Sequence, residues 1–385
     1  MKLIDTTKEL ELACKILKKQ NLIAIDCEFI REKSYFPLPC LIQVGYENEA
    51  ILIDPLSEDL DFSSFAKIMK NKKILKIFHS GRQDIEIIYN LMKVIPEPVF
   101  DTQIAAQACG YGEAISYENL VKACCLIELD KTCRLTNWQL RPLTEEQLKY
   151  ASGDVTHLIQ CYHKINEFLE ENNRKDWVKD ELEDLIDITH YEINTENSWQ
   201  RIRHNNHSLK FLNALKELAK WREERAMKHN ISRQSIIKDD LLVNVATAFP
   251  ENLEDMKQVR GMRSDISKSV LATEMIDVLD KLTKKGFDKK LKIKEKVISL
   301  SPTQQSLYEI LKLVLKIKSN EYGVVTHIIS SEKNLREYIK NPKTKNQITK
   351  GWRYEVFGKY VEEFSKGKLS LQYCPETHNI VIKEI

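Results

Sequence analysis

LIAIDCEF, the stretch from Leu22 to Phe29, is a nearly apolar run that carries two acids, Asp26 and Glu28. A short apolar run of this kind predicts a buried β-strand. Because alternate side chains of a strand point to one face, we expect Asp26 and Glu28 to lie side by side. Two buried carboxylates take up protons unless a cation keeps both ionised, so the pair points to a divalent-metal site. Surface acids at the end of a strand are the alternative.

Further strands and helices are predicted around this one. Residues 41–55 (LIQVGYENEAILIDP) hold two apolar runs joined by a polar turn, which favours a hairpin beside the first strand. Ile74–Phe78 is typical of a third strand and leads into a segment with apolar residues at helical spacing. Asp101 is expected to cap a short helix, and Thr144 with Gln147 spells a capping box before a longer one. Strands and helices therefore alternate in the first half of the chain.

Two more acids lie on the predicted helices. Asp84 falls in the first turn of the helix after the third strand, where a carboxylate also meets the favourable end of the helix dipole. Asp154 follows Tyr150 by one helical turn, so that the phenol and the carboxylate share a face. Taken alone, Asp84 is interpreted as a helix-capping acid and Asp154 as a solvent-exposed acid of a helix. Together with Asp26 and Glu28, acids from separate elements can converge on one site.

Such a cluster of oxygen ligands, without a supporting Cys or His pair, favours Mg²⁺ or Mn²⁺ over Zn²⁺. Two of these ions about 4 Å apart are the usual arrangement for in-line displacement at phosphorus. One ion would activate the attacking water and the other would stabilise the leaving oxygen. We therefore expect two divalent ions and hydrolysis of a phosphodiester.

Charge divides the chain into an acidic and a basic half. Residues 1–200 hold 23 Lys and Arg against 34 Asp and Glu, a net charge of −11, whereas residues 201–385 hold 36 against 23, a net charge of +13. The basic half indicates a polyanionic partner bound through release of counterions. Two solvated surfaces of opposite sign are the alternative. From Ser208 onward, apolar residues recur mainly at helical spacing.

Composition also bears on where the chain works. Nine cysteines without CxxC spacing fit neither a disulfide framework nor a zinc site, so we expect them to be reduced and mostly buried. The longest apolar runs fall far short of the roughly 20 residues that span a bilayer. The first residues, MKLIDTTKEL, lack the features of a secretion signal. We expect a cytoplasmic protein with no membrane partner.

Three short motifs carry a resemblance to a known family. DCEF at Asp26–Phe29, HSGRQD at His79–Asp84 and YASGD at Tyr150–Asp154 closely resemble the three exonuclease motifs of the DEDD superfamily. The tyrosine four residues before the last aspartate resembles the tyrosine subclass, and the segments LIQ, LIDP, FDTQIAA and TNWQLRPLT resemble the ribonuclease D family. The resemblance covers nearly the whole chain, because residues 208–283 resemble an HRDC domain and residues 303–370, with their GWRYE segment, resemble a second one.

The resemblance implies a fold and an order of domains. An α/β ribonuclease-H-like exonuclease domain, with a mixed sheet flanked by helices, is expected over residues 1–200. Two small all-α HRDC-like domains follow over 208–283 and 303–370. The basic segment 284–302 is interpreted as their linker, whose lysines either are solvated or contact phosphates. Residues 371–385 form a short hairpin or a loose tail.

The resemblance also implies the roles of the site residues. Asp26, Glu28, Asp84 and Asp154 would bind the metal ions, and Tyr150 would orient the attacking water, so that all five are expected to be catalytic. Proteins of this family remove nucleoside 5′-monophosphates from RNA 3′ ends, including those of tRNA precursors. The expected activity is that of a metal-dependent 3′-to-5′ exoribonuclease acting on RNA with a free 3′ end.

Two other functions stay open at this point. A 3′-to-5′ exodeoxyribonuclease is one, because two-metal hydrolysis does not itself read the 2′-hydroxyl. A non-catalytic RNA-binding scaffold is the other. A monomer is favoured, although the sequence leaves the oligomeric state open.

Several conspicuous residues are left out of the catalytic set. His79 is interpreted as structural and Asp101 as a helix cap. Trp138 and Arg141 either contact nucleic acid or are a packed tryptophan and a surface arginine. Trp221 has apolar neighbours at helical spacing, which predicts a core position.

Overall fold

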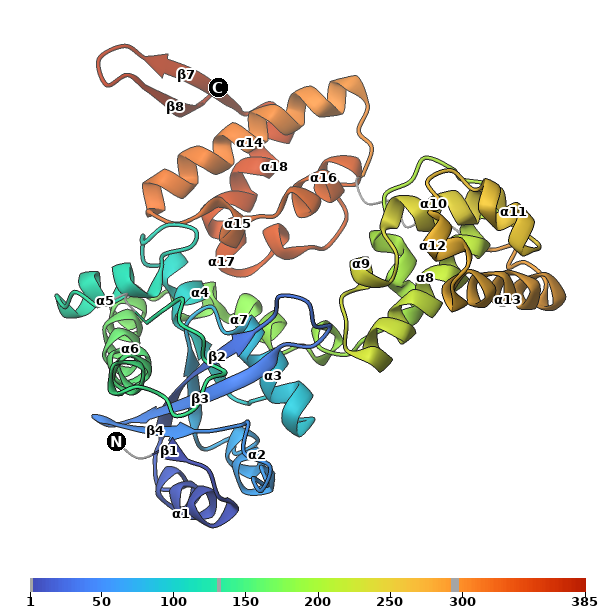
Figure 1. Ribbon diagram of the computed structural model, residues 1–385. Coiled ribbons are helices and arrows are strands. Elements are labelled where there is room, and N and C mark those ends of the chain that lie inside the picture. The colour runs from blue at the N-terminus through green and yellow to red at the C-terminus, as the bar shows by residue number, and fades with distance from the viewer. Residues whose placement is uncertain (1–2, 130–132, 292–297) are drawn as a thin grey trace. The chain divides into compact units, whose positions relative to one another are not determined.

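The computed structural model describes residues 3–129, 133–291 and 298–385 and divides into two compact units (Figure 1). The first unit consists of Met1–Glu28, Pro39–His190 and Val297–Ile385, and the second of Phe29–Leu38 and Tyr191–Lys296. Among the described helices, none combines the length and the apolar character needed to cross a bilayer.

The first unit is built on a six-stranded mixed sheet in the order β1-β4-β3-β2-β5-β6. Its strands are β1 (Leu3–Ile4), β2 (Leu22–Ile30), β3 (Leu38–Tyr46), β4 (Glu49–Ile53), β5 (Leu75–Phe78) and β6 (Val99–Asp101). Strands β3 and β4 form an antiparallel hairpin, while β5 runs parallel to both β2 and β6. The three predicted strand regions, including the hairpin over residues 41–55, are confirmed.

Helices connect and cover these strands. They are α1 (Thr7–Leu17), α2 (Ser63–Met69), α3 (Arg82–Met92), α4 (Thr102–Gln107), α5 (Tyr117–Cys125), α6 (Glu145–Glu171) and α7 (Lys179–Leu185), with short 3₁₀ turns η1 (Lys175–Trp177) and η2 (Ile188–His190). The longest, α6, begins at the predicted capping box, in which both reciprocal hydrogen bonds of Thr144 and Gln147 are present. Val155 and Leu158 of α6 pack on Ala24 of β2 and on β5, so α6 lies along one face of the sheet (Figure 1).

The C-terminal part of the first unit is a small helical bundle. Its elements are α14 (Pro302–Tyr322), α15 (Thr326–Ile329), α16 (Glu332–Lys340), η4 (Gln347–Thr349), α17 (Gly351–Arg353), the π-helical turn η5 (Tyr354–Gly358) and α18 (Lys359–Ser365). One hydrophobic core contains residues of this bundle, such as Leu311 and Phe357, together with Val121 and Ile165 of α5 and α6. The bundle is therefore continuous with the sheet-bearing part of the unit.

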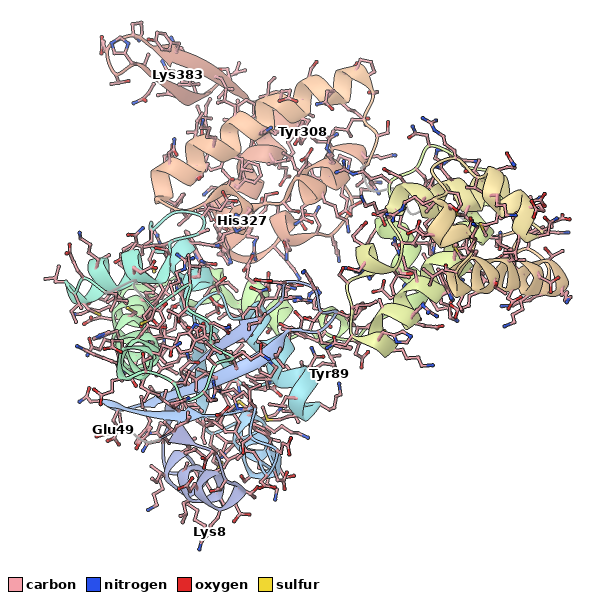
Figure 2. The ribbon with its side chains drawn as sticks, in the orientation of Figure 1. Lys8, Glu49, Tyr89, Tyr308, His327 and Lys383 are labelled. Carbon is pink, nitrogen blue, oxygen red and sulfur yellow. The ribbon has the colours of Figure 1, made fainter. Side chains whose placement is uncertain are left out.

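Polar and aromatic contacts join the same two parts. His327 of α15, labelled in Figure 2, lies with its Nε2 atom 3.0 Å from Oε1 of Gln107 in α4. The rings of Trp177 and Trp352 stack at 4.3 Å between centroids. At the chain end, β7 (Leu369–Cys374) and β8 (Asn379–Glu384) form an antiparallel hairpin, which settles the choice between hairpin and loose tail.

The second unit is helical. Its elements are η3 (Thr195–Arg201), α8 (Leu209–His229), α9 (Arg233–Ile236), α10 (Asp239–Ala248), α11 (Leu253–Gln258), α12 (Ser264–Ser267) and α13 (Val270–Lys285). Trp221 packs against its core, as predicted, while its indole N–H donates a 2.9 Å hydrogen bond to Glu274. The predicted linker begins inside α13, and residues 292–297 lie outside the described part of the chain.

The segment between β2 and β3 also belongs to this helical unit. Tyr35 packs against the unit's core and donates a hydrogen bond to the buried carboxylate of Glu223. The backbone N–H of Phe36 donates to the side-chain oxygen of Asn230 at 2.9 Å. A short loop of the first half thus completes a domain formed by the second half.

Candidate active site

Strand β2 presents two carboxylates on one face of the sheet. Ile25 and Cys27 are buried, whereas Asp26 and Glu28, which alternate with them, are half-buried. This is the alternation expected of a strand with period two. The prediction that these two acids share a face is therefore met.

Helix α6 carries the third carboxylate, Asp154, across from β2. The helix approaches the sheet closely because β3 has a glycine, Gly45, at the point of contact. Tyr117 at the start of α5 holds the same turn of α6, since its hydroxyl donates a 3.0 Å hydrogen bond to the carbonyl oxygen of Gly153. The backbone beside Asp154 is thus held from the sheet and from α5.

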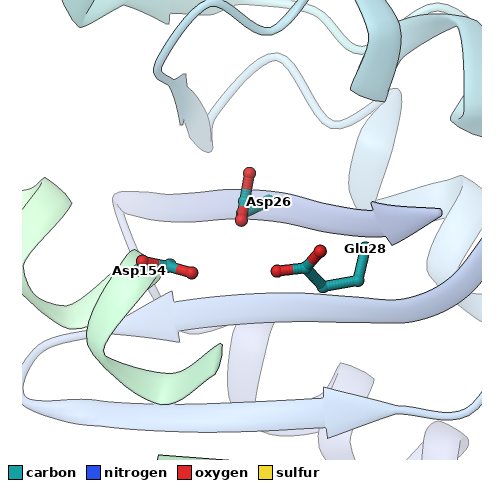
Figure 3. Close-up of side chains that lie close together, drawn as sticks. All are labelled: Asp26, Glu28 and Asp154. Atoms are coloured by element: carbon teal, nitrogen blue, oxygen red, sulfur yellow. The ribbon is translucent and has the colours of Figure 1, made fainter. Parts of the chain in front are cut away.

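These elements bring three carboxylates together. Asp26, Glu28 and Asp154 each offer an oxygen, and these oxygens all lie within 4.8 Å of one another. Figure 3 shows the three side chains pointing toward a common space between β2 and α6. An oxygen cluster of this size has the donor type that Mg²⁺ and Mn²⁺ prefer.

Asp84 lies near enough to Asp26 to feel its charge but is not one of these three. It lies in the first turn of α3, is 6% exposed and is hydrogen-bonded to the thiol of Cys27. The turn before α3 is fastened by Asp101, whose carboxylate accepts the N–H of Gly81 at 2.7 Å and that of Ser80 at 3.2 Å. Asp101 thus does more than cap α4, the role predicted for it.

Burial and mutual repulsion raise the pKa values of these acids. Desolvation raises the pKa of Asp26 to about 6. Desolvation, followed by the charge of Asp26, raises the pKa of Glu28 to about 9. The same two causes raise the pKa values of Asp84 and Asp154 well above their ordinary range. Without a cation, the cluster therefore binds protons near neutral pH, and a divalent ion would compete with them.

Tyr150 completes this group of side chains. Its hydroxyl is hydrogen-bonded to Asp154, one turn along α6, as the spacing in the sequence predicts. Burial and the charge of Asp154 raise the pKa of Tyr150, so that the phenol stays protonated at neutral pH. A neutral hydroxyl beside a carboxylate can hold a water molecule in a fixed orientation.

Comparison with known proteins places this site in a family. The model of a family described as 3′-5′ exonuclease matches residues 1–170, which contain the whole cluster. Ribonuclease D of Bartonella henselae is 39% identical over 374 residues, which cover 96% of this chain and 91% of that protein. Ribonuclease D of Sphingobium indicum is 38% identical over 369 residues, which cover 96% and 95%. The chain belongs to the ribonuclease D family.

The remaining comparisons concern the fold of this ribonuclease D family member. The model of the HRDC domain matches residues 211–272. A crystal structure of Escherichia coli RNase D superposes with a TM-score of 0.80 at 23% identity, covering 95% of this chain and 98% of that one. The predicted exonuclease fold and the helical HRDC domain after it are therefore confirmed. The second HRDC-like domain, over residues 303–370, stays a prediction.

The other conspicuous residues of this ribonuclease D relative are held by protein contacts. The two ring nitrogens of His79 lie 2.9 Å from the Thr102 hydroxyl and 3.1 Å from the Ile115 carbonyl oxygen, which agrees with a structural role. Arg141 is no surface arginine, because its guanidinium forms two 2.6 Å hydrogen bonds with the carboxylate of Asp54. Trp138 is 3% exposed and packed.

Sequence reasoning missed a cation beside the cluster. Desolvation and the neighbouring acids raise the pKa of Glu28, and the charge of Arg134 opposes this rise only weakly. The Arg134 guanidinium lies 3.8 Å from Glu118, a neighbour of Asp154. Beside Asp154 opens a hollow of about 360 Å³ that is lined in part by Lys149. No motif singled out either basic residue, because each becomes significant only through its distance from the acids.

Proposed function

We propose that this ribonuclease D family member is a metal-dependent 3′-to-5′ exoribonuclease, releasing nucleoside 5′-monophosphates from the 3′ end of RNA. The observation that carries the proposal is the convergence of Asp26, Glu28 and Asp154 within 4.8 Å, inside the segment that matches the 3′-5′ exonuclease family. The relatives at 38–39% identity are themselves named ribonuclease D, which supports RNA as the substrate.

The donor set fits two divalent ions. Asp26, Glu28, Asp84 and Asp154 would hold them, because oxygen ligands suit Mg²⁺ and Mn²⁺ and because the raised pKa values indicate that Arg134 does not compensate the negative charge of the cluster. When bound, the ions would activate the attacking water and neutralise the leaving oxygen. Either Mg²⁺ or Mn²⁺ suits these oxygen ligands.

The protein's own groups would position the reactants. The protonated hydroxyl of Tyr150, fixed by Asp154, would orient the attacking water. Arg134 is placed to attract the phosphates of the RNA, since its guanidinium lies beside the acids and is 65% exposed. Without cations, the carboxylates would instead repel the phosphate.

RNA would also be bound outside the catalytic domain. The exonuclease domain is assigned to residues 1–200 and the HRDC-like domains to 208–283 and 303–370, with a basic linker at 284–302 and a terminal segment at 371–385. The net charge of +13 on residues 201–385 supports contacts with the RNA backbone. We assign tRNA precursors as substrates, a cytoplasmic location and a monomeric state as parts of this proposal.

A cleavage assay tests the reaction. Single-stranded RNA labelled at its 5′ end is incubated with the full chain and Mg²⁺ beside a matched DNA strand. A ladder that shortens from the 3′ end, faster on RNA than on DNA, is expected. Asp154→Asn should abolish it, whereas Asp59→Asn, which changes an exposed acid of the same domain, should not. Circular dichroism of both variants verifies their folding.

The same assay separates the other functions. Preferred cleavage of the DNA strand would favour the exodeoxyribonuclease, and tight RNA binding without any product would favour the scaffold. A tRNA precursor with an extended 3′ end, compared with the same RNA already trimmed, tests the proposed natural substrate. Unchanged hydrolysis by Asp26→Asn would overturn the assignment of the site.

A further inference from the structure

Three cysteines meet where α5 ends against α6. Cys124 and Cys125 are the last two residues of α5, and Cys161 lies in α6. The Sγ atoms of Cys125 and Cys161 are 3.9 Å apart, and the Cys124 thiol is also hydrogen-bonded to Cys161. All three are free thiols. Helix packing thus brings Cys161 against two thiols that lie at least 36 residues earlier in the chain.

The three thiols differ in accessibility. Cys161 is fully buried in the core of the first unit, whereas Cys124 and Cys125 are half-buried. A small solute can therefore reach the end of α5 before it reaches α6. Oxidation would begin on α5, and a thiol of α6 would lie within reach of the oxidised sulfur.

They also differ in acidity. The hydrogen bond with Cys161, helped by Tyr111 and by the charge of Lys164, lowers the pKa of Cys124 to about 7. The same hydrogen bond raises the pKa of Cys161, and burial raises that of Cys125. Because the thiolate is the nucleophile, Cys124 is the attacking group of the three near neutral pH. Cys161 remains a neutral thiol beside it.

We propose that Cys124 and Cys161 form a peroxide-sensitive pair whose disulfide slows the nuclease. The Cys124 sulfur attacks one oxygen of hydrogen peroxide, the O–O bond breaks, and a sulfenic acid and one water result. The Cys161 sulfur then attacks the sulfenic sulfur, the S–O bond breaks, and a second water leaves. Two thiols and one peroxide thus give one disulfide and two waters, a conversion that thiol reductants reverse.

One member of the pair, Cys161, lies on α6, the helix that carries Asp154. Cys161 follows Asp154 by seven residues, or about 10 Å along α6. At its other end, α5 already holds α6 through the hydrogen bond from Tyr117 to Gly153. A disulfide needs its sulfurs about 2.05 Å apart, so that the bridge would pull the two helices together at a second point.

The displacement of α6 should affect the chemical step more than RNA binding. Since a 1 Å misplacement can lower a rate about 10²-fold, we expect oxidation to reduce kcat by about tenfold or more, with KM nearly unchanged. This effect on kcat rests on the proposed exoribonuclease function, whereas formation of the disulfide does not.

Peptide mapping tests the bridge directly. The reduced full chain is treated with hydrogen peroxide, its remaining thiols are alkylated, and disulfide-linked peptides are identified by mass spectrometry. RNA cleavage is measured in parallel before and after dithiothreitol. A Cys124–Cys161 bridge, with a loss of kcat that dithiothreitol reverses, is expected. Absence of the bridge, or a bridge without any loss of kcat, would overturn the proposal.

Variants assign the two partners. Cys124→Ser and Cys161→Ser should prevent both the bridge and the loss of kcat, while Cys125→Ser should keep both. Cys374→Ser is the matched control, because hydrogen bonds from Thr377 lower the pKa of Cys374 as well, although it lies on β7. A bridge from Cys125 to Cys161 in the Cys124→Ser variant would overturn the assignment. If the reduced wild type leaves RNA intact, the proposed function fails and the peptide map still decides the disulfide.

Discussion

Gly45 of β3 lies so close to α6 that a Cβ atom on it would be 2.7 Å from the carbonyl oxygen of Val155. Real Cβ atoms do not approach a backbone oxygen so closely, and here the obstacle is helix backbone rather than a flexible side chain. The distance between α6 and the sheet therefore depends on the absence of a Cβ atom at position 45. Asp154, which immediately precedes Val155, faces β2 at that distance.

Gly45→Ala is expected to lower kcat by about 10²-fold, because α6 must move away and carry Asp154 with it. Single-turnover cleavage of labelled RNA measures this loss. Ile42→Val on the same strand is the control, since it removes a buried methylene, costs about 1 kcal/mol of unfolding free energy and leaves the contact with α6 unchanged. Equal losses of kcat in both variants would show that general destabilisation, and not the position of α6, limits the rate.

Asp101→Ala should destabilise the protein by about 3 kcal/mol, because several hydrogen bonds to one buried carboxylate are lost together. Asp101 is 1% exposed and accepts backbone N–H groups from Gln103 and Ile104 in α4 as well as from Ser80 and Gly81. Urea denaturation measures the change in unfolding free energy. The turn that precedes Asp84 is released at the same time, so kcat should also fall.

Asn252→Ala provides the comparison for this loss. Asn252 caps α11 by accepting two N–H groups, as Asp101 does for α4, but it is exposed. Loss of such a cap alone costs about 1 kcal/mol. The second role of Asp101, holding the turn before α3, predicts a larger loss of unfolding free energy than in Asn252→Ala. A difference of less than about 0.5 kcal/mol between the two losses is within the usual scatter for independent sites and would contradict that role.

The features that the sequence predicted well are local ones. Asp26 and Glu28 share a face because a strand has period two, and α6 begins where Thr144 and Gln147 form a capping box. Such patterns depend on residues two to four positions apart, and they are legible without knowledge of the rest of the chain. The prediction that Tyr150 lies beside Asp154 succeeded for the same reason.

Contacts between distant residues could not be predicted in this way. The hydroxyl of Tyr35 donates a hydrogen bond to Glu223, 188 residues later, and the guanidinium of Arg141 donates one to Asp54, 87 residues earlier. The residues next to an arginine or a tyrosine in the sequence do not reveal its distant partner. The sequence analysis therefore left open whether Arg141 contacts nucleic acid or lies at the surface. The two bonds that Asp101 accepts from before α3 were missed for the same reason.

Arg353→Met should loosen the C-terminal bundle from the exonuclease part. Arg353 is 4% exposed and donates to Asp180 at 2.6 Å, to Glu181 at 2.7 Å and to the carbonyl of Ile328 at 2.8 Å. The guanidinium is buried, whereas the carboxylates of Asp180 and Glu181 are 44% and 23% exposed, so the loss of these charged hydrogen bonds should cost about 2 kcal/mol. Limited proteolysis should then cut within residues 302–365 at lower urea concentrations.

Lys333→Met is the control for this variant, because its ion pair with Glu337 is 78% exposed on the lysine side and contributes about 0.5 kcal/mol or less. Equal protease sensitivity of both variants would contradict the role of Arg353.

The shared hydrophobic core also means that deleting residues 201–385 would expose apolar surface of the exonuclease part. RNA contacts of the basic half are better tested by substitution.

Neutralising lysines of the HRDC domain should weaken the salt dependence of RNA binding. Lys228 of α8 and Lys281 of α13 are exposed and line one hollow of about 300 Å³. If each contacts a phosphate, the double variant to Gln should reduce the slope of log K against log salt concentration by about 1.4, as expected for single strands. Fluorescence anisotropy at several salt concentrations measures the slope. The exposed Lys18 and Lys19 of the exonuclease domain serve as the control pair. If their replacement by Gln reduces the slope equally, the effect reflects the net charge of the protein and not phosphate contacts of Lys228 and Lys281.

The metal-free protein should lose stability as the pH rises, and divalent ions should restore it. Burial raises the pKa of Asp26 to about 6 and that of Glu28 to about 9, above their values in the unfolded chain. A carboxyl group with a raised pKa stabilises the fold while it is protonated, and this contribution is lost as the pH rises through the folded pKa. The melting temperature in EDTA should therefore fall from about pH 4, the ordinary pKa of a carboxyl group, to about pH 9, and the part due to Asp26 should be complete near pH 6. Because protons and metal ions compete for the same oxygens, stabilisation by Mn²⁺ should grow over the same interval.

The double variant Asp26→Asn with Glu28→Gln should show a flatter profile and little response to Mn²⁺. A wild-type profile that is equally flat in EDTA would mean that these acids are already neutralised within the protein.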